Sequence, residues 1–348
     1  MIRRVFCVLL IVGLAPGTWI RSRPAPSNHS QAVTVAPLAL PPGCCLIGPI
    51  RAEAAWQISS RNSAFGGYSA LVARSDGRLV AYSDGGVMLD FPVPGTRSTE
   101  PARMTVAIPS ANPRKDNRDV ESATRDPATG QIWLALEGRD EIRRFGADGA
   151  AQGKVTVAAM QAWPGNTGPE GMVRLRDGRF VVLSESYSGW FDVTRHPALL
   201  FGSDPVSGAA PQPFRFIGSP GYRPTDMAQL PDGRVLIVMR RLVWPFPIRF
   251  AIRLMLADPA EIRPGQDWRA LDLGGLDDAA LLDNYEGLAV TAQGDGRLTG
   301  WLISDDNAAA LQRTLLIRLA IDPARLPKRK GAPTEASAPF QSPDGVKR

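Results

Sequence analysis

Short apolar runs and glycine-containing turns alternate along most of the chain. Five apolar runs directly follow a turn, and four of these turns read Asp-Gly-Arg. Asp-Gly favours a tight hairpin turn, because glycine adopts positive φ angles at no steric cost. A second strand candidate precedes each turn, so the pattern predicts five β-hairpins. The runs that follow the turns are residues 79–83, 132–136, 180–184, 235–239 and 298–304.

The hairpins repeat at a regular interval. Each interval leaves room for two further strands, which residues 88–93 and 102–108 supply in the first unit. Four strands per unit at a period near 50 residues are typical of the blades of a β-propeller. The first strands open at Ser69, Glu121, Glu170, Asp226 and Glu286, which lie 49 to 60 residues apart.

The two ends of the repeat predict how the ring closes. The last unit has a third strand at residues 314–321, after which the sequence becomes polar. Residues 54–59, which precede the first unit, can supply the missing fourth strand and leave no open sheet edge. We therefore predict an all-β fold, a β-propeller of five four-stranded blades closed by an N-terminal strand. A sixth, degenerate blade and a β-sandwich of hairpins are the alternatives.

The composition agrees with many short strands and excludes one class of partner. The 348 residues include 34 Gly and 31 Pro, more than globular proteins use on average. The net charge is +6, but the arginines are scattered and form no basic block with interleaved aromatic residues. We therefore expect no nucleic-acid partner. A mild basic excess favours a small anionic substrate.

The N-terminus is typical of an export signal. Arg3 and Arg4 precede an apolar run at 5–14, and small residues follow it. The run is shorter than the ~20 residues of a membrane-spanning helix, so we expect no stable membrane insertion after removal of the signal. The two arginines leave a twin-arginine export route open. We expect a periplasmic or secreted protein with a signal peptide at 1–20, a Pro/Ala-rich linker at 21–45, the propeller at 46–325 and a polar disordered tail at 326–348.

Two positions of the repeat carry charge in register. One opens the first strand of each hairpin, and the other comes just past the second strand. Both lie at the same end of an antiparallel hairpin, and the first strand of a blade lines the central channel. We therefore expect these side chains to gather around one channel mouth. The first position holds Ser69, Glu121, Glu170, Asp226 and Glu286, and the second holds Asp84, Glu137, Glu185, Arg240 and Asp305.

Gathered carboxylates repel one another unless they are protonated, paired with arginine or bound to a cation. Oxygen donors without His or Cys suit calcium, ahead of magnesium. For any single residue, turn capping or an ordinary ion pair such as Asp226–Arg240 is the competing explanation. The metal ligands that we expect are Glu121, Glu170, Glu286, Asp226 and Glu137.

The remaining charged residues of the two positions suit proton transfer and charge stabilisation. Glu185 or Asp305 would act as general base. Arg240 would neutralise negative charge that develops in the transition state. The chain has only two histidines, His29 and His196. This excludes a His-based zinc site, and His196 stands in no nucleophile-elbow context.

Several motifs at these positions together are similar to an exported family of bacterial and plant proteins that is named for an esterase-like activity of phytase. The similarity covers roughly residues 60–325 and implies a propeller-like domain in the cell envelope. It also implies phosphodiesterase, phosphatase or esterase activity. Ser69 and Arg240 stand where a carboxylate would be expected, which centres the site on Glu121, Glu170 and Glu286. The motifs are Asp-Val-Glu-Ser at 119–122, Gly-Pro-Glu-Gly at 168–171, Leu-Ser-Glu at 183–185, Asn-Tyr-Glu-Gly-Leu at 284–288 and Ile-Ser-Asp-Asp-Asn at 303–307.

These observations predict an exported metal-assisted hydrolase of phosphoesters or carboxylic esters that acts on a small anionic or ester substrate. Two alternatives remain. One is a lactonase, and the other is a non-catalytic propeller that binds a ligand or a protein, because the propeller fold hosts both kinds of function. Turnover separates the enzymes from the binding protein, and the choice of substrate separates the two enzymes.

Overall fold

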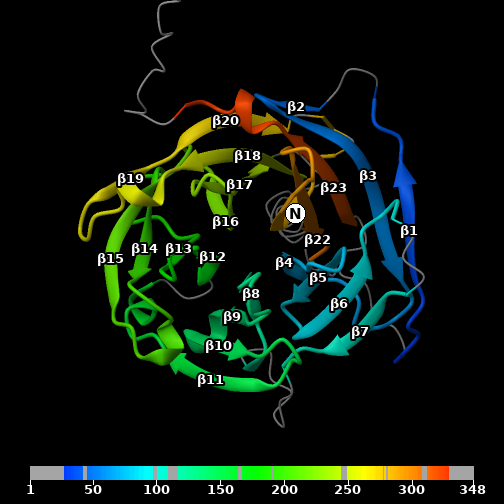
Figure 1. Ribbon diagram of the computed structural model, residues 1–348, viewed down its shortest axis with the longest axis horizontal. Coiled ribbons are helices and arrows are strands. Elements are labelled where there is room, and N and C mark those ends of the chain that lie inside the picture. The colour runs from blue at the N-terminus through cyan, green and yellow to red at the C-terminus, as the bar shows by residue number, and fades with distance from the viewer. Residues whose placement is uncertain are drawn as a thin grey trace, which may run out of the picture.

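The computed structural model describes residues 27–41, 45–96, 100–108, 117–163, 167–189, 191–243, 249–276, 278–279, 281–307 and 312–328. Within these ranges the chain forms five β-sheets that stand around a central axis (Figure 1). The expected all-β propeller of five blades is confirmed. The expected signal peptide, and the tail from residue 329 onward, lie outside the described residues.

The first two blades each consist of four consecutive antiparallel strands, with the first strand innermost and the fourth at the rim (Figure 1). Blade one contains β4 (Tyr68–Ala73), β5 (Arg78–Ser83), β6 (Val87–Pro92) and β7 (Arg103–Val106). Blade two contains β8 (Val120–Arg125), β9 (Ile132–Leu136), β10 (Glu141–Phe145) and β11 (Ala151–Thr156).

Blades three and four exchange a strand at the rim. After β18 (Arg249–Ala257) the chain adds β19 (Asp267–Arg269) to blade three, parallel to β15 (Pro211–Ile217). It then returns to blade four as β20 (Leu271–Leu276). This excursion explains the long interval between the fourth and fifth repeats. Blade three contains β12 (Pro169–Arg174), β13 (Phe180–Ser184), β14 (Arg195–Phe201) and β15 (Pro211–Ile217). Blade four contains β16 (Arg223–Gln229), β17 (Val235–Val243), β18 (Arg249–Ala257) and β20 (Leu271–Leu276).

Blade five joins the two ends of the propeller chain. Strand β3 (Ile50–Ser60) pairs antiparallel with β23 (Thr314–Ile321), with Ile58 opposite Thr314 and Ile50 opposite Ile321. The expected closure by an N-terminal strand is confirmed. The linker expected at 21–45 needs correction, because residues 33–38 form β1 (Val33–Leu38), which extends the same sheet beyond β3. The other strands of this sheet are β2 (Leu46–Ile47), β21 (Asn284–Ala292) and β22 (Leu298–Asp305).

The hydrophobic core lies between the blades. Five separate clusters of buried apolar side chains occupy the five junctions between neighbouring blades. For example, Leu134 of blade two packs with Val80 of blade one, while Trp133, one residue earlier, packs with Phe180 of blade three. Successive residues of a strand point to opposite faces, so each central strand supplies both adjoining clusters.

The Asp-Gly-Arg turns connect the paired strands of their hairpins, as the sequence predicted. Gly178 has a φ of 89°, in the left-handed region that favours glycine. The flanking Asp177 and Arg179 form an ion pair at 2.7 Å, and Asp232–Arg234 and Asp295–Arg297 repeat this pairing at 2.7 and 2.6 Å.

Within the described ranges, helical structure is limited to single 3-10 turns, of which η2 (Glu137–Arg139) bears on the site. Among the described residues, no helix has the length and apolar character required to cross a lipid bilayer.

Candidate functional site

The innermost strand of every blade contains a β-bulge at the same end. The pairing register shifts between Tyr68 and Ala70, Val120 and Ser122, Pro169 and Gly171, Pro224 and Asp226, and Tyr285 and Gly287. A bulge leaves one residue unpaired and re-aims its side chain. The unpaired residues are therefore Ser69, Glu121, Glu170, Thr225 and Glu286.

Blade four thus differs from the alignment that the sequence suggested. Thr225, not Asp226, holds the bulge position, and Asp226 lies one residue further along β16. The Asp226 side chain is buried, and its two carboxylate oxygens accept hydrogen bonds from the backbone amides of Met227 at 2.8 Å and Leu288 at 2.6 Å. Burial raises the pKa of Asp226 well above its usual value. The bond from Leu288 ties blade four to blade five, and a role for Asp226 as a metal ligand stays a prediction.

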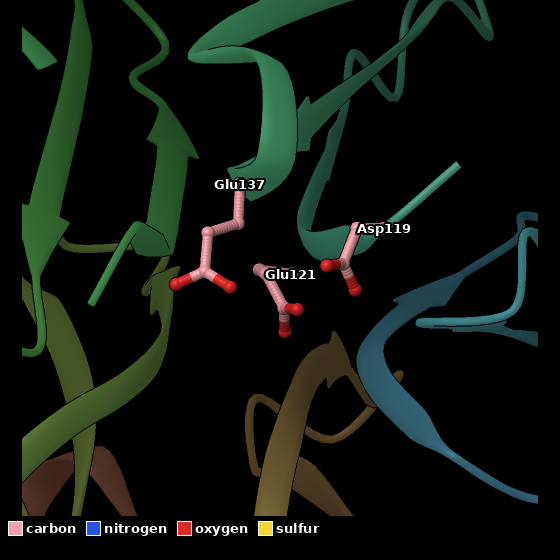
Figure 2. A group of neighbouring side chains, drawn as sticks. All are labelled: Asp119, Glu121 and Glu137. Carbon is pink, nitrogen blue, oxygen red and sulfur yellow. The ribbon is translucent and has the colours of Figure 1, made fainter. Parts of the chain in front are cut away.

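Three carboxylates of blade two approach one another closely (Figure 2). Asp119, Glu121 and Glu137 each offer an oxygen within 4.8 Å of the others, and this group can hold a metal ion. Glu121 and Glu137 were both expected here, as metal ligands. We call these three residues the acidic triad.

The backbone fixes the members of the acidic triad. Asp119 comes just before β8, and its carbonyl accepts a hydrogen bond from the amide of Glu137 at 3.1 Å. Glu137 opens η2 directly after β9, and its Oε1 accepts a hydrogen bond from the Gly168 amide of blade three at 2.8 Å. A Cβ atom on Gly168 would lie 2.6 Å from Glu137 Cγ, so glycine is required for this approach.

The charges of blades two and three act on one another. Burial, followed by the charges of Glu170, Asp119 and Glu137, raises the pKa of Glu121 well above its usual value. The pKa of Glu170 is also raised, by burial and by the charge of Glu185, while the charge of Arg240 lowers it in part. The pKa of Glu170 is therefore affected both by charges of the acidic triad and by the charge of Arg240. A buried acidic group of this kind favours a cation, because the cation relieves both the repulsion and the burial of charge.

Arg240 joins blades three, four and five. It forms ion pairs with Glu286 of β21 and, at 3.2 Å, with Glu185, which follows β13. Its Nη1 donates to Asn284 Oδ1 at 2.6 Å, and the side-chain Nδ2 of Asn284 in turn donates to Glu286 Oε1 at 2.8 Å. The alternative Asp226–Arg240 pair is wrong, since Arg240 reaches carboxylates of the two neighbouring blades. A second cation, Arg223, approaches Glu185 at 3.4 Å.

Asp305 provides a titratable carboxyl group at the junction of blades five and one. It is buried, and its Oδ1 accepts a hydrogen bond from the Asn307 amide at 2.7 Å. Burial, together with the charges of Asp84 and Asp306, raises the pKa of Asp305 to about 7, against the opposing effect of Arg240. A carboxyl group with a pKa near neutrality suits general acid–base catalysis.

His196 takes part in packing. Its ring is fully buried between Tyr187 and Phe216, at centroid distances of 5.1 and 6.1 Å. Its Nδ1 lies 2.8 Å from the Ser186 carbonyl oxygen, and burial lowers its pKa to about 4. A neutral, buried imidazole of this kind agrees with the absence of a nucleophile-elbow context around His196 in the sequence.

The sequence pattern assigned no role to Asp119 or Arg223, and it offered Asn284 only as a further oxygen donor. All three stand two residues before the bulged residue of their strand, and Asn284 pairs with Asp305 just as Arg223 pairs with Arg240. Alternate residues of a strand point to the same side, so this third position could have been found by reading two residues back from each bulge.

Comparisons with known proteins place this geometry in a family. The model of the phytase-like family, described as esterase-like activity of phytase, matches residues 63–308. No curated protein matches the chain.

Solved structures with a similar arrangement include a gluconolactonase from Xanthomonas campestris, at 12% identity and a TM-score of 0.43, where the match covers 86% of this chain and all (100%) of that one. An endo-arabinase from Bacteroides thetaiotaomicron matches at 10% identity and a TM-score of 0.48, over 74% of this chain and 95% of that one. Hydrazine synthase from Kuenenia stuttgartiensis matches at 11% identity and a TM-score of 0.37, over 73% of this chain and 62% of that one, less than two thirds of its length. Likenesses of this size carry no functional argument.

Proposed function

The chain belongs to the phytase-like family, as its motifs indicated, and we propose that it is a metal-assisted hydrolase of ester bonds, with phosphoesters as the first substrate class. The observation that carries this proposal is the gathering of the Asp119, Glu121 and Glu137 carboxylates within 4.8 Å of one another. The charges of this triad and of Arg240 both act on the neighbouring Glu170 of blade three. A site with a cation-binding group beside an arginine can bind an anionic oxygen between two positive charges.

We propose that Asp119, Glu121 and Glu137 hold the cation and that Glu170 and Glu286 complete the negative charge around it. Carboxylate oxygens alone suit calcium better than zinc or copper. A cation bound there would polarise a substrate oxygen and lower the pKa of a bound water.

We assign to Arg240 the binding of the substrate's negatively charged oxygens. Its Nη2 contacts Glu185 and its Nη1 contacts Asn284 and Glu286, so the orientation of the guanidinium is fixed before substrate arrives. A planar guanidinium held in this way matches two oxygens of a phosphoryl or carboxyl group.

Asp305 is the stronger candidate for the general base. Its pKa of about 7 lets it accept a proton from water near neutral pH and release it afterwards. Glu185 forms ion pairs with both Arg223, at 3.4 Å, and Arg240, at 3.2 Å. We therefore assign to Glu185 the positioning of Arg240.

Export is part of the same proposal. The signal-like segment at 1–20 points to a periplasmic or secreted enzyme, and calcium suits such a compartment as a cofactor.

The test is hydrolysis of a bis-aryl phosphate, a monoaryl phosphate, an aryl acetate and a γ-lactone by the full chain, with calcium, with magnesium and with a chelator. Glu170→Gln/Glu286→Gln is the test variant, and Asp177→Asn, in a turn at the opposite end of a hairpin, is the control. We expect metal-dependent turnover of a phosphate ester that only the first variant loses. Turnover of the lactone alone would identify a lactonase. Absence of turnover on all four substrates, with calcium still raising the melting temperature, would leave a binding propeller.

A further inference from the structure

The central channel opens into a cavity at the end away from the carboxylates. Its volume is about 550 Å³, within the range of small-molecule sites. All five innermost strands line it, which places it on the propeller axis (Figure 1). Its apolar wall includes Leu71, Ala123, Val173, Met227 and Leu288.

This cavity is separate from the site described above. Its lining begins at Leu71 in β4 and Ala123 in β8, two residues beyond the bulged Ser69 and Glu121, and contains none of the carboxylates assigned to hydrolysis. From Glu121 to Arg125, the last residue of β8, the strand advances about 13 Å at ~3.3 Å per residue. One strand therefore carries an acidic group at one mouth and a basic group at the other.

The rim of the cavity is basic. Three arginines line it, namely Arg125, Arg174 and Arg176, against one carboxylate, Asp126. Asp126 approaches Arg174 at 3.3 Å and neutralises it. The formal balance of the lining is thus +3 − 1 = +2.

Because Asp126 neutralises Arg174, Arg125 is an arginine of this lining that is available to bind an anion. It is half-buried, and within the described ranges its guanidinium has neither a hydrogen bond nor an ion pair. Arg176, also on the rim, donates only from Nη1, to the Pro231 carbonyl at 2.5 Å, and from its backbone amide. A half-buried guanidinium beside an apolar wall favours an oxyanion with an apolar body, because the anion satisfies the donors while the body displaces water from the wall.

We propose that this cavity is a second ligand site, which binds a small amphipathic carboxylate with its head group on Arg125 and its apolar body in the channel. The site does not depend on the hydrolase proposal, because it shares no residue with it.

The probe is octanoate, titrated into the full chain by calorimetry, with 1-octanol as the neutral analogue and acetate as the head group alone. We expect saturable one-to-one binding of octanoate, with octanol and acetate weaker by about tenfold or more, the usual effect of one charge-assisted hydrogen bond. Binding of octanol as tight as octanoate would overturn the role of Arg125, and absence of saturable octanoate binding would overturn the site.

Paired variants locate the ligand. Arg125→Leu removes the cation, and Ala292→Trp fills the cavity from an exposed lining position. Each should weaken octanoate binding about tenfold or more. Arg297→Leu, an arginine of an exposed turn outside the cavity, should leave it unchanged.

Arg125 also borders a smaller cavity of about 360 Å³ between blades one and two, which Val106 lines and Ala292 does not. Val106→Trp is therefore the matched control for Ala292→Trp. Loss of binding in Val106→Trp alone, or in the opposite-mouth variant Glu170→Gln, would place octanoate elsewhere and overturn the proposal.

Discussion

Glu121→Gln tests the electrostatics of the acidic triad without any assumption about the substrate. Glu121 is buried beside Asp119 and Glu137, and its pKa is raised by burial and by its acidic neighbours. The folded state therefore holds a proton on Glu121 at pH values where the unfolded chain has released it. Folding stability must fall as the pH rises from the unfolded pKa through the folded one. Replacement by the neutral, nearly isosteric glutamine removes this loss.

The size of the effect follows from the spacing of the carboxylates. Two unit charges at most 4.8 Å apart repel by at least about 3.5 kcal/mol at an effective dielectric constant of ~20. Protonation of Glu121 limits how much stability the native protein loses through this repulsion. We therefore expect metal-free Glu121→Gln to be more stable than the native protein by about 2–3 kcal/mol near pH 8. The gain should vanish below about pH 4, where Glu121 is protonated in both states. In a chain of this size the shift in melting temperature is about 2 °C per kcal/mol.

The assay is thermal unfolding in chelator at several pH values, followed by addition of calcium. At a calcium concentration ~100-fold above its dissociation constant, the native protein should gain about 2.7 kcal/mol, and Glu121→Gln should gain less, since it lacks a ligand. Without metal, Glu121→Gln should therefore be more stable than the native protein, and calcium should raise its stability by less.

Glu141→Gln is the matched control. Glu141 is also buried, but Lys154 at 2.8 Å and Arg143 hold its pKa below the usual value in spite of its burial. Its loss should destabilise the protein near pH 8 and leave the calcium response intact. If Glu121→Gln were also destabilising in chelator, the charge of Glu121 would be favourable and the reasoning on repulsion would be refuted.

Three further changes have expected outcomes. Arg240→Lys keeps the charge but loses the bridge from Glu185 to Asn284 and Glu286, so kcat/KM for a phosphate ester should fall about 100-fold; an unchanged rate would remove Arg240 from the site. Because the pKa of Asp305 is raised to about 7, the hydrolysis rate should rise with pH through about 7 in the native protein, and Asp305→Asn should abolish this rise; a retained pH profile would assign the base elsewhere. Gly287→Ala would place a Cβ atom 2.6 Å from Ile303 and 2.9 Å from the Leu71 backbone, so it should destabilise folding by about 1–3 kcal/mol in urea denaturation, whereas Gly294→Ala, with open space around it, should have little effect.

The fold could be predicted from the sequence because the repeat fixes both the strand period and the turn chemistry. The Asp-Gly-Arg turns mark one end of each hairpin, and the missing fourth strand of the last unit correctly required an N-terminal partner. The rim strands were less visible. Strand β1 lies in a Pro- and Ala-rich stretch, and β19 joins blade three through pairing that no local pattern encodes.

The candidate site was predictable in position and less so in detail. Glu121 and Glu137 were correctly placed at one end of blade two, because a hairpin fixes which residues share an end. The β-bulges were invisible to a count of residues, and the bulge in β16 moves Thr225 into the position expected for Asp226. The partners of Arg240 depend on how neighbouring blades meet, so a pattern read within one blade pointed to Asp226 when the actual partners are Glu185 and Glu286.

The measurement that tests the proposed metal-assisted hydrolysis most directly is the calcium dependence of bis-aryl phosphate turnover, recorded beside calorimetric calcium binding for the native chain, Glu121→Gln and Glu141→Gln. We expect turnover to saturate at the calcium concentration that saturates binding, and both to be lost in Glu121→Gln and kept in Glu141→Gln. Full turnover in chelator, or calcium binding that survives in Glu121→Gln, would contradict a metal-assisted hydrolytic centre at the acidic triad.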